Sequence, residues 1–169
     1  MRTRLRSSKP APTPTPAPGL AGQAAAADAR ALALELGGLR APEHVDVMGL
    51  GIVLEAGEHA HRTTWCWVRW RVDGQWSQAL WCHVVVTDNR VLVRLPDGTL
   101  RSQWWSTLVG FEADLAAGHV VLDYGDGRPR LFSGLGAAVL AVTGVAMLYG
   151  PGALVSHPSL DPIRSTAAP

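Results

Sequence analysis

Residues 65–98 read "WCWVRWRVDGQWSQALWCHVVVTDNRVLVRLPDG". It holds five of the chain's seven Trp, both Cys, one His and four Arg. Its apolar residues recur with a period of two, which is the pattern of β-strands that turn one face to a core. Asp73-Gly74 and Pro96-Asp97-Gly98 have the composition of tight turns. The stretch therefore predicts consecutive antiparallel strands joined by short turns.

The first hairpin of this stretch has a register that can be worked out. If the chain turns about Gly74, residues whose numbers sum to 148 lie opposite each other. Cys66 then faces Cys82 on the core side, where Trp70 also points. We expect the two thiols to act as small buried groups in a reducing compartment rather than as a disulfide. The opposite parity places three Trp and two Arg on the outer face: Trp65, Trp67, Trp81, Arg69 and Arg71.

Three Trp on an outer strand face are a large apolar area to leave bare. The helix expected at residues 21–39 covers them, or a second copy does, or they bind a partner. Trp and Arg dominate the energetics of protein interfaces. The interaction face that we predict from this consists of Trp65, Trp67, Trp81, Arg69 and Arg71.

Short strands with regular turns continue as far as residue 132, which is typical of a small antiparallel sandwich or barrel. Residues 131–156 then contain no charge. Gly150-Pro151-Gly152 interrupts this run and leaves about 16 helical residues, roughly 24 Å, against a hydrocarbon core of about 30 Å. We therefore expect a helix at 135–149 that packs on the sheet rather than a membrane span.

The N-terminal part has a different composition. Residues 1–20 alternate Pro with Ala and Thr, which favours polyproline II, and we predict a disordered tail. Residues 21–39 are Ala-rich and predict a helix that ends at Gly37-Gly38. "GLGIVLEAGE", residues 49–58, predicts one more strand that enters a turn at Ala56-Gly57. The main domain is expected at 43–150, and 151–169 is a C-terminal extension.

The number and placement of charged residues bear on which partners the chain can bind and where it is located. Fourteen Arg stand against a single Lys, a bias that we interpret as the codon usage of a GC-rich genome of actinobacterial type. Residues 10–169 carry eleven cations and fourteen anions, a net charge of −3, which argues against nucleic-acid binding by the folded part. The basic start leads into prolines rather than an apolar segment, so we predict no signal peptide and a cytoplasmic protein. Four cations lie at the N-terminus: Arg2, Arg4, Arg6 and Lys9.

Several motifs resemble the GRAM and bacterial pleckstrin-homology-like (PH-like) domains. They are an apolar-Gly-Glu turn, a Thr-Asp turn between strands, an aromatic pair, an apolar-Gly-aromatic strand and a Leu-Tyr-Gly helix end. In this chain they are Ala56-Gly57-Glu58, Val86-Thr87-Asp88-Asn89-Arg90-Val91, Trp104-Trp105, Val109-Gly110-Phe111 and Leu148-Tyr149-Gly150.

This resemblance covers residues 50 to about 150 and implies both fold and function class. The fold would be α+β and mainly β, an open barrel of about seven antiparallel strands capped by a C-terminal helix, with the Ala-rich helix in front. The function would be a non-catalytic module that binds protein segments or lipid head groups. The Lys-rich phosphoinositide loop of many PH domains is absent from this sequence.

The sequence shows no catalytic motif such as Gly-x-Ser-x-Gly or Gly-x-x-x-x-Gly-Lys. A metal site would have to use His59, His61, Cys66, Cys82 and His83. His59 and His61 would share one face of a strand, which zinc can use, but His83 has the opposite parity from Cys82, and no Cys-x-x-Cys or His-Glu-x-x-His occurs. We therefore expect no cofactor and no enzyme. The leading interpretation is a cytoplasmic interaction module for a protein partner. The first alternative is an anionic lipid surface, and the second is a metal-dependent enzyme. The lipid contacts would be the basic N-terminal residues together with Arg69, Arg71, Arg90 and Arg94.

Overall fold

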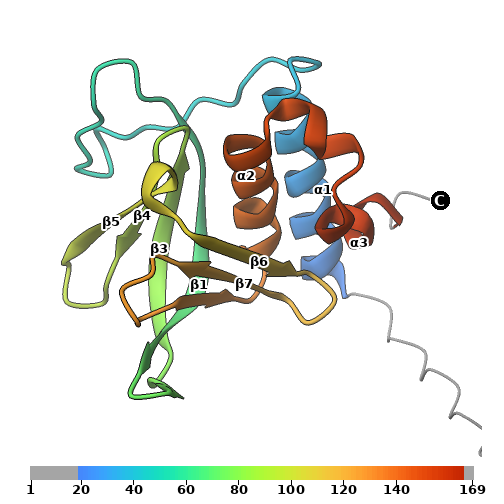
Figure 1. Ribbon diagram of the computed structural model, residues 1–169. Helices are drawn as coiled ribbons and strands as arrows, with labels where there is room; N and C mark the ends of the chain where they lie inside the picture. The colour runs from blue at the N-terminus through green and yellow to red at the C-terminus, as the bar shows by residue number, and fades with distance from the viewer. Residues whose placement is uncertain (1–18, 166–169) are drawn as a thin grey trace, which may run out of the picture.

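The computed structural model describes residues 19–165; the predicted tail at 1–20 lies almost wholly outside these residues. The described residues form an α+β structure with one open antiparallel sheet and three α-helices (Figure 1). The sheet order is β5-β4-β3-β1-β8-β7-β6, and the short β2 pairs only with β1. The strands are β1 Ala60–Val72, β2 Gln75–Trp76, β3 Leu80–Thr87, β4 Arg90–Arg94, β5 Leu100–Trp104, β6 Gly110–Asp114, β7 His119–Asp123 and β8 Arg130–Ser133. The helices are α1 Leu20–Leu36, α2 Ala137–Tyr149 and α3 Asp161–Ser165, with 3₁₀ turns at Trp105–Thr107, Pro151–Val155 and Pro158–Leu160.

The long strand β1 is the centre of the sheet. It pairs with β3 on one side and with β8 on the other, so it joins a meander of β1, β3, β4 and β5 to a meander of β6, β7 and β8. The predicted pairing of Cys66 with Cys82 is confirmed. The predicted centre of the turn is not, because Val72 pairs with Gln75 at the tip, and the pairing of β1 shifts by one residue between β2 and β3. Asp73 and Gly74 have φ values of 50° and 78° at the turn, as a primed hairpin turn requires.

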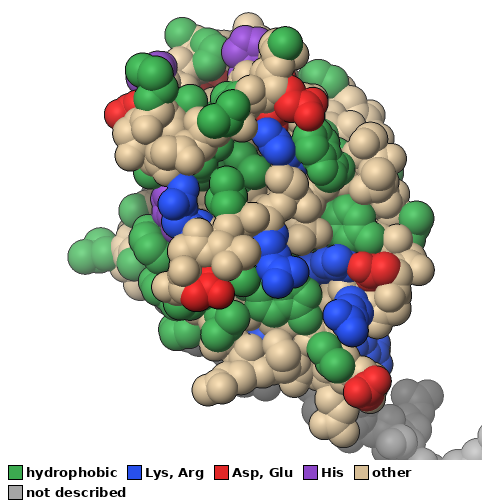
Figure 2. Space-filling view, turned by 90° about the vertical axis from the view of Figure 1, so that its left-hand side faces the viewer, with side chains coloured by type: hydrophobic (Ala, Val, Ile, Leu, Met, Phe, Trp, Pro, Cys, Tyr) green, Lys and Arg blue, Asp and Glu red, His purple; other side chains and the backbone are tan. Residues whose placement is uncertain are grey.

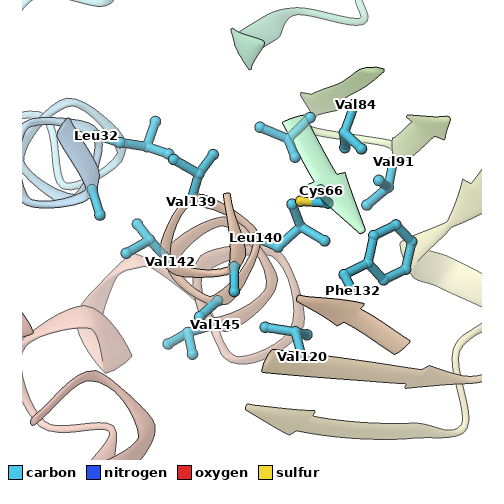
Figure 3. Close-up of a cluster of buried hydrophobic side chains, with 14 of the residues drawn as sticks. Leu32, Cys66, Val84, Val91, Val120, Phe132, Val139, Leu140, Val142 and Val145 are labelled. Atoms are coloured by element: carbon cyan, nitrogen blue, oxygen red, sulfur yellow. The ribbon is translucent and has the colours of Figure 1, made fainter. Parts of the chain in front are cut away.

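Helix α2 packs on one face of the sheet, and the predicted packed helix is confirmed. Its apolar residues, Val139, Leu140, Val142 and Val145 among them, are buried between the sheet and α1 (Figure 3). The helix begins at Ala137, two residues later than expected. Among the described residues, no helix is long and apolar enough to cross a membrane.

Helix α1 packs against α2, on the side away from the sheet (Figure 1). Ala29 and Leu32 are completely buried in this contact. The helix ends at Leu36, where Gly37 donates its N–H to the carbonyl of Ala33 and Gly38 takes a φ of 73°. Docking on α2 leaves α1 unable to cover the outer face of the sheet.

Two buried ion pairs attach other segments to the sheet. Arg62 of β1 donates to Glu35 of α1 over 2.7 and 2.8 Å and to Asp28 over 2.9 Å. Arg90 of β4 donates twice to Glu58, each time over 2.9 Å. A buried charge is costly without its partner, so each pair fixes the position of the segment that supplies the carboxylate.

We expect the free energy of unfolding to fall as the pH drops below 4.5, the ordinary pKa of these Glu side chains. Hydrogen bonds from Arg62 lower the pKa of Glu35. Burial raises the pKa of Glu58, but hydrogen bonds led by those from Arg90 outweigh it and lower the pKa overall. A carboxyl group with a lowered folded pKa stabilises the fold above its unfolded pKa, and the stabilisation is lost as pH falls through the folded value.

Urea unfolding between about pH 7 and about pH 3 measures this dependence. Glu35→Gln, which removes one of the two titrating groups, should flatten the profile in part. A free energy of unfolding that stays constant across the range would contradict the prediction.

The strand predicted in the segment 49–58 is wrong, but the turn predicted at Ala56-Gly57 is confirmed, with a φ of 79° at Gly57. Asp46 accepts the N–H groups of Gly49 and Leu50, and Gly51 has a φ of 64°, so the chain turns here instead of extending. Ile52 instead covers Val85 and Leu92 on the outer face of the sheet. The C-terminal extension also folds: Leu154, Leu160 and Ile163 are buried residues of the main core.

A candidate docking face of stacked tryptophans

The outer face of β1 and β3 carries a continuous row of aromatic rings. Trp67 is the strand partner of Trp81, and Trp65 is the partner of His83. The ring centroids of Trp67 and Trp81 lie 4.8 Å apart, those of Trp81 and Trp65 lie 5.8 Å apart, and those of Trp65 and His83 lie 5.0 Å apart. Offset and tilted stacking at such distances stabilises each ring on its neighbour. We call these four residues the indole ladder.

The indole ladder is open to solvent in the described part of the chain. Trp65, Trp67 and Trp81 are 48%, 46% and 43% exposed, although each also stacks on a neighbouring ring. The ladder lies on the face of the sheet opposite to α2, since the inward residues Cys66 and Cys82 belong to the core. Figure 2 views the side of the molecule away from the helices, where hydrophobic and Arg side chains are interspersed. Helix α1, which was one of the elements expected to cover these Trp side chains, therefore does not cover them.

The two Arg of the predicted interaction face differ in what they contact. Arg69 is exposed and forms no ion pair or hydrogen bond through its side chain to a described residue. Arg71 lies at the hairpin tip, where its Nε donates to the carbonyl of Gly74 over 3.3 Å and its guanidinium lies 5.9 Å from the ring of Trp76. The structure thus places Arg69 beside the ladder and Arg71 beyond its end.

Arg90 and Arg94, the other predicted lipid contacts, are engaged within the fold. Arg90 pairs with Glu58 and stacks 4.6 Å from the ring centroid of Trp104. Arg94 donates to the carbonyl of Leu50 over 2.6 Å. Both lie on the outer face, but their guanidinium groups hold the 41–59 segment against the sheet.

The candidate metal ligands are dispersed. Cys66 and Cys82 are free thiols in the core, and burial raises their pKa values to about 12 and about 11. His59 contacts Asp88, with Nδ1 and Oδ2 3.3 Å apart, while His83 stacks in the ladder. No group of three or more His, Cys, Asp or Glu side chains in residues 19–165 is close enough to hold a metal ion.

Sequence reasoning missed the buried Arg62 and Glu58. A signal for Arg62 was present, because its even number gives it the inward parity of Cys66 and Val68 on the same strand. Glu58 precedes the sheet in a loop, and nothing in its neighbours indicated burial.

Comparisons of this chain with protein-family models, curated proteins and solved structures find no match.

Proposed function

We propose that this chain is a non-catalytic, cytoplasmic interaction module with a PH-like fold, and that it docks a protein segment on the indole ladder. One observation carries the proposal: three stacked Trp remain about half exposed on the open face of the sheet. The fold assignment is supported by the element order, in which two strand meanders are followed by a closing apolar helix.

The ladder has the properties that a docking site needs. Each ring is already held by its neighbours, so binding costs little side-chain entropy. The indole N–H groups and the neighbouring Arg69 supply polar contacts at the edge of an apolar centre, which is the usual anatomy of an interface. A face of this kind suits an extended peptide better than a small polar ligand.

The alternative function, binding to anionic lipids, is favoured by the exposed Arg69 and Arg71 next to Trp side chains, which suit a membrane interface. It is weakened by the contacts of Arg90 and Arg94 within the fold. The two functions predict different behaviour in salt, because attraction to anionic lipid is screened within about 8–10 Å at ordinary ionic strength.

Trp67→Ala combined with Trp81→Ala is expected to weaken peptide docking at least about tenfold, or about 1.4 kcal/mol. The probe is a peptide selected from a displayed random library with the full chain as bait, and tryptophan fluorescence measures its affinity. Trp76→Ala is the matched control, since Trp76 is exposed on β2 outside the ladder.

Selected peptides that bind the ladder variant and the full chain equally would contradict the proposal. Co-sedimentation with phosphatidylserine vesicles at low and high salt tests the alternative. Vesicle binding that disappears at high salt and falls on Arg69→Ala combined with Arg71→Ala would favour the lipid function instead.

A further inference from the structure

We infer that a groove in the helical layer, beside α1, binds a free fatty acid, with the carboxylate on Arg30 and the alkyl chain along the leucine side chains of the groove. The indole ladder lies on the opposite face of the sheet, so this second site goes beyond the proposed function. Three observations support it: the size and lining of the groove, its exposed apolar rim, and the charge at its edge.

The groove lies between the second half of α1 and the segment that follows α2. Helix α3 packs against α1 (Figure 1), and the 3₁₀ turn Pro151–Val155 supplies further lining residues. Its volume is about 540 Å³, within the range of about 300–1,000 Å³ that is usual for small-molecule sites. The buried part of its lining is entirely aliphatic and consists of Leu154, Leu160 and Ile163.

The rim of the groove is apolar and open to solvent. At the end of α1, Leu39 donates its N–H to the carbonyl of Leu34 over 2.8 Å, and Gly38 donates to that of Glu35 over 3.0 Å. This is the Schellman arrangement, which brings the first two side chains to the same side of the helix end. Leu39 and Leu34 are nevertheless 79% and 46% exposed, and Val155 of the other lining segment is 78% exposed. An alkyl chain among these side chains would remove apolar surface from water.

Arg30 supplies a positive charge at the edge of the groove. Its Nη1 donates to the carbonyl of Ile163 over 3.0 Å, which fixes the position of the side chain. Within residues 19–165 this guanidinium forms no ion pair, and its Nε and Nη2 make no hydrogen bond. These nitrogens can donate to a ligand, and a carboxylate matches the geometry of a guanidinium.

No carboxylate among the described residues lines the groove, where it would repel such a ligand. The charged lining residues are Arg30 and Arg164. Arg164 is engaged within the fold, because it pairs with Asp161 and donates to the carbonyl of Leu154 over 3.2 Å. The groove therefore combines an apolar channel with one available cation, and its complement is a single anionic group on an alkyl chain.

A fatty acid fits this lining better than a peptide does. A peptide would bring backbone N–H and C=O groups into an aliphatic channel, where they would lose water without gaining partners. An alkyl chain has no polar groups to satisfy, and the one polar group of a fatty acid lies at its end, where Arg30 is.

Isothermal titration calorimetry of the full chain with decanoate tests the inference. The affinity should rise about two- to fourfold for each methylene added between octanoate and dodecanoate, because each methylene buries more apolar surface. Arg30→Gln should lower the affinity for decanoate about tenfold. The same variant should bind decanol as tightly as the full chain does, since the alcohol has no charge for Arg30 to attract.

Leu34→Glu places a carboxylate on the rim and should lower the affinity for decanoate at least about tenfold. Ala27→Glu is the matched control, because Ala27 is exposed two turns earlier on the same helix and does not line the groove. Circular dichroism and urea unfolding establish that both variants are folded at the temperature of the titration.

Three results would overturn the inference. A full chain that does not bind decanoate would leave the groove to a protein segment, either residues 166–169 of this chain or a partner. Equal losses of affinity in Leu34→Glu and Ala27→Glu would show that the groove is not the site. Binding that is lost in the variant with Trp67→Ala and Trp81→Ala, but kept in Leu34→Glu, would place the fatty acid on the indole ladder instead.

Discussion

Arg62→Met is expected to lower the free energy of unfolding by about 3–5 kcal/mol, the cost of breaking a buried ion pair by removing one partner. The Arg62 and Glu35 side chains are each only 4% exposed, and two hydrogen bonds join them. Met fills much of the Arg volume but leaves the Glu35 carboxylate buried without its main partner. The pKa of Glu35, which Arg62 lowers, should rise accordingly.

Urea unfolding measures the effect, and Arg40→Met is the matched control. Arg40 also faces Glu35, at 3.9 Å, but its side chain is 58% exposed, so this change should cost no more than about 1 kcal/mol. Adding Glu35→Leu to Arg62→Met removes the unpaired charge and should recover much of the lost stability. If Arg62→Met and Arg40→Met lower the free energy of unfolding equally, then the buried Arg62–Glu35 pair contributes no more to stability than the exposed Arg40–Glu35 pair.

The loss of Arg62 could affect the candidate site, because strand β1 carries both Arg62 and two Trp side chains of the indole ladder. Arg62 holds α1 against the start of the strand, and three residues later the same strand begins to supply the ladder. A weakened Arg62 contact should therefore loosen α1 before it disturbs Trp65 and Trp67, which pair with β3 independently of α1.

The faces of β1 and β3 could be predicted from the sequence because side chains alternate strictly along a strand. The two-residue turn sets only the pairing of β1 with β2, and a shift of one residue follows before β3. This reasoning placed Cys66 opposite Cys82 and three Trp outside. The same period failed at 49–58, where apolar residues alternate without a neighbouring strand to pair with. There, Asp46 and a left-handed Gly51 turn the chain.

The position of α1 could not be predicted, because an Ala-rich helix fits several apolar surfaces equally well. The choice between α2 and the Trp face depends on the Arg62–Glu35 pair and on the burial of Leu32. Both are tertiary contacts between residues far apart in the chain. The exposure of the ladder, and with it the candidate function, follows from this choice.

Gly136→Ala is expected to cost about 3 kcal/mol of stability, at the upper end of the usual range for overpacking. A Cβ at this position would lie 2.6 Å from Sγ of Cys66, 2.7 Å from Oγ1 of Thr64 and 2.8 Å from the carbonyl oxygen of Trp65. The φ of Gly136 is −72°, so the backbone itself tolerates Ala. The whole effect therefore arises from the close approach of α2 to β1.

The clash partly involves backbone, so rotation of a side chain cannot relieve it. Either the start of α2 moves away from the sheet, or β1 shifts at Trp65 and the ladder loses its stacking. Gly152→Ala is the control, because a Cβ there meets no heavy atom within 4 Å. Urea unfolding should separate the two variants, and the affinity for a selected peptide should fall only for Gly136→Ala. If Gly136→Ala lowers the stability but leaves the peptide affinity unchanged, then the start of α2 moves and β1 does not. In that case the pairing of β1 with β3 alone fixes the position of the ladder.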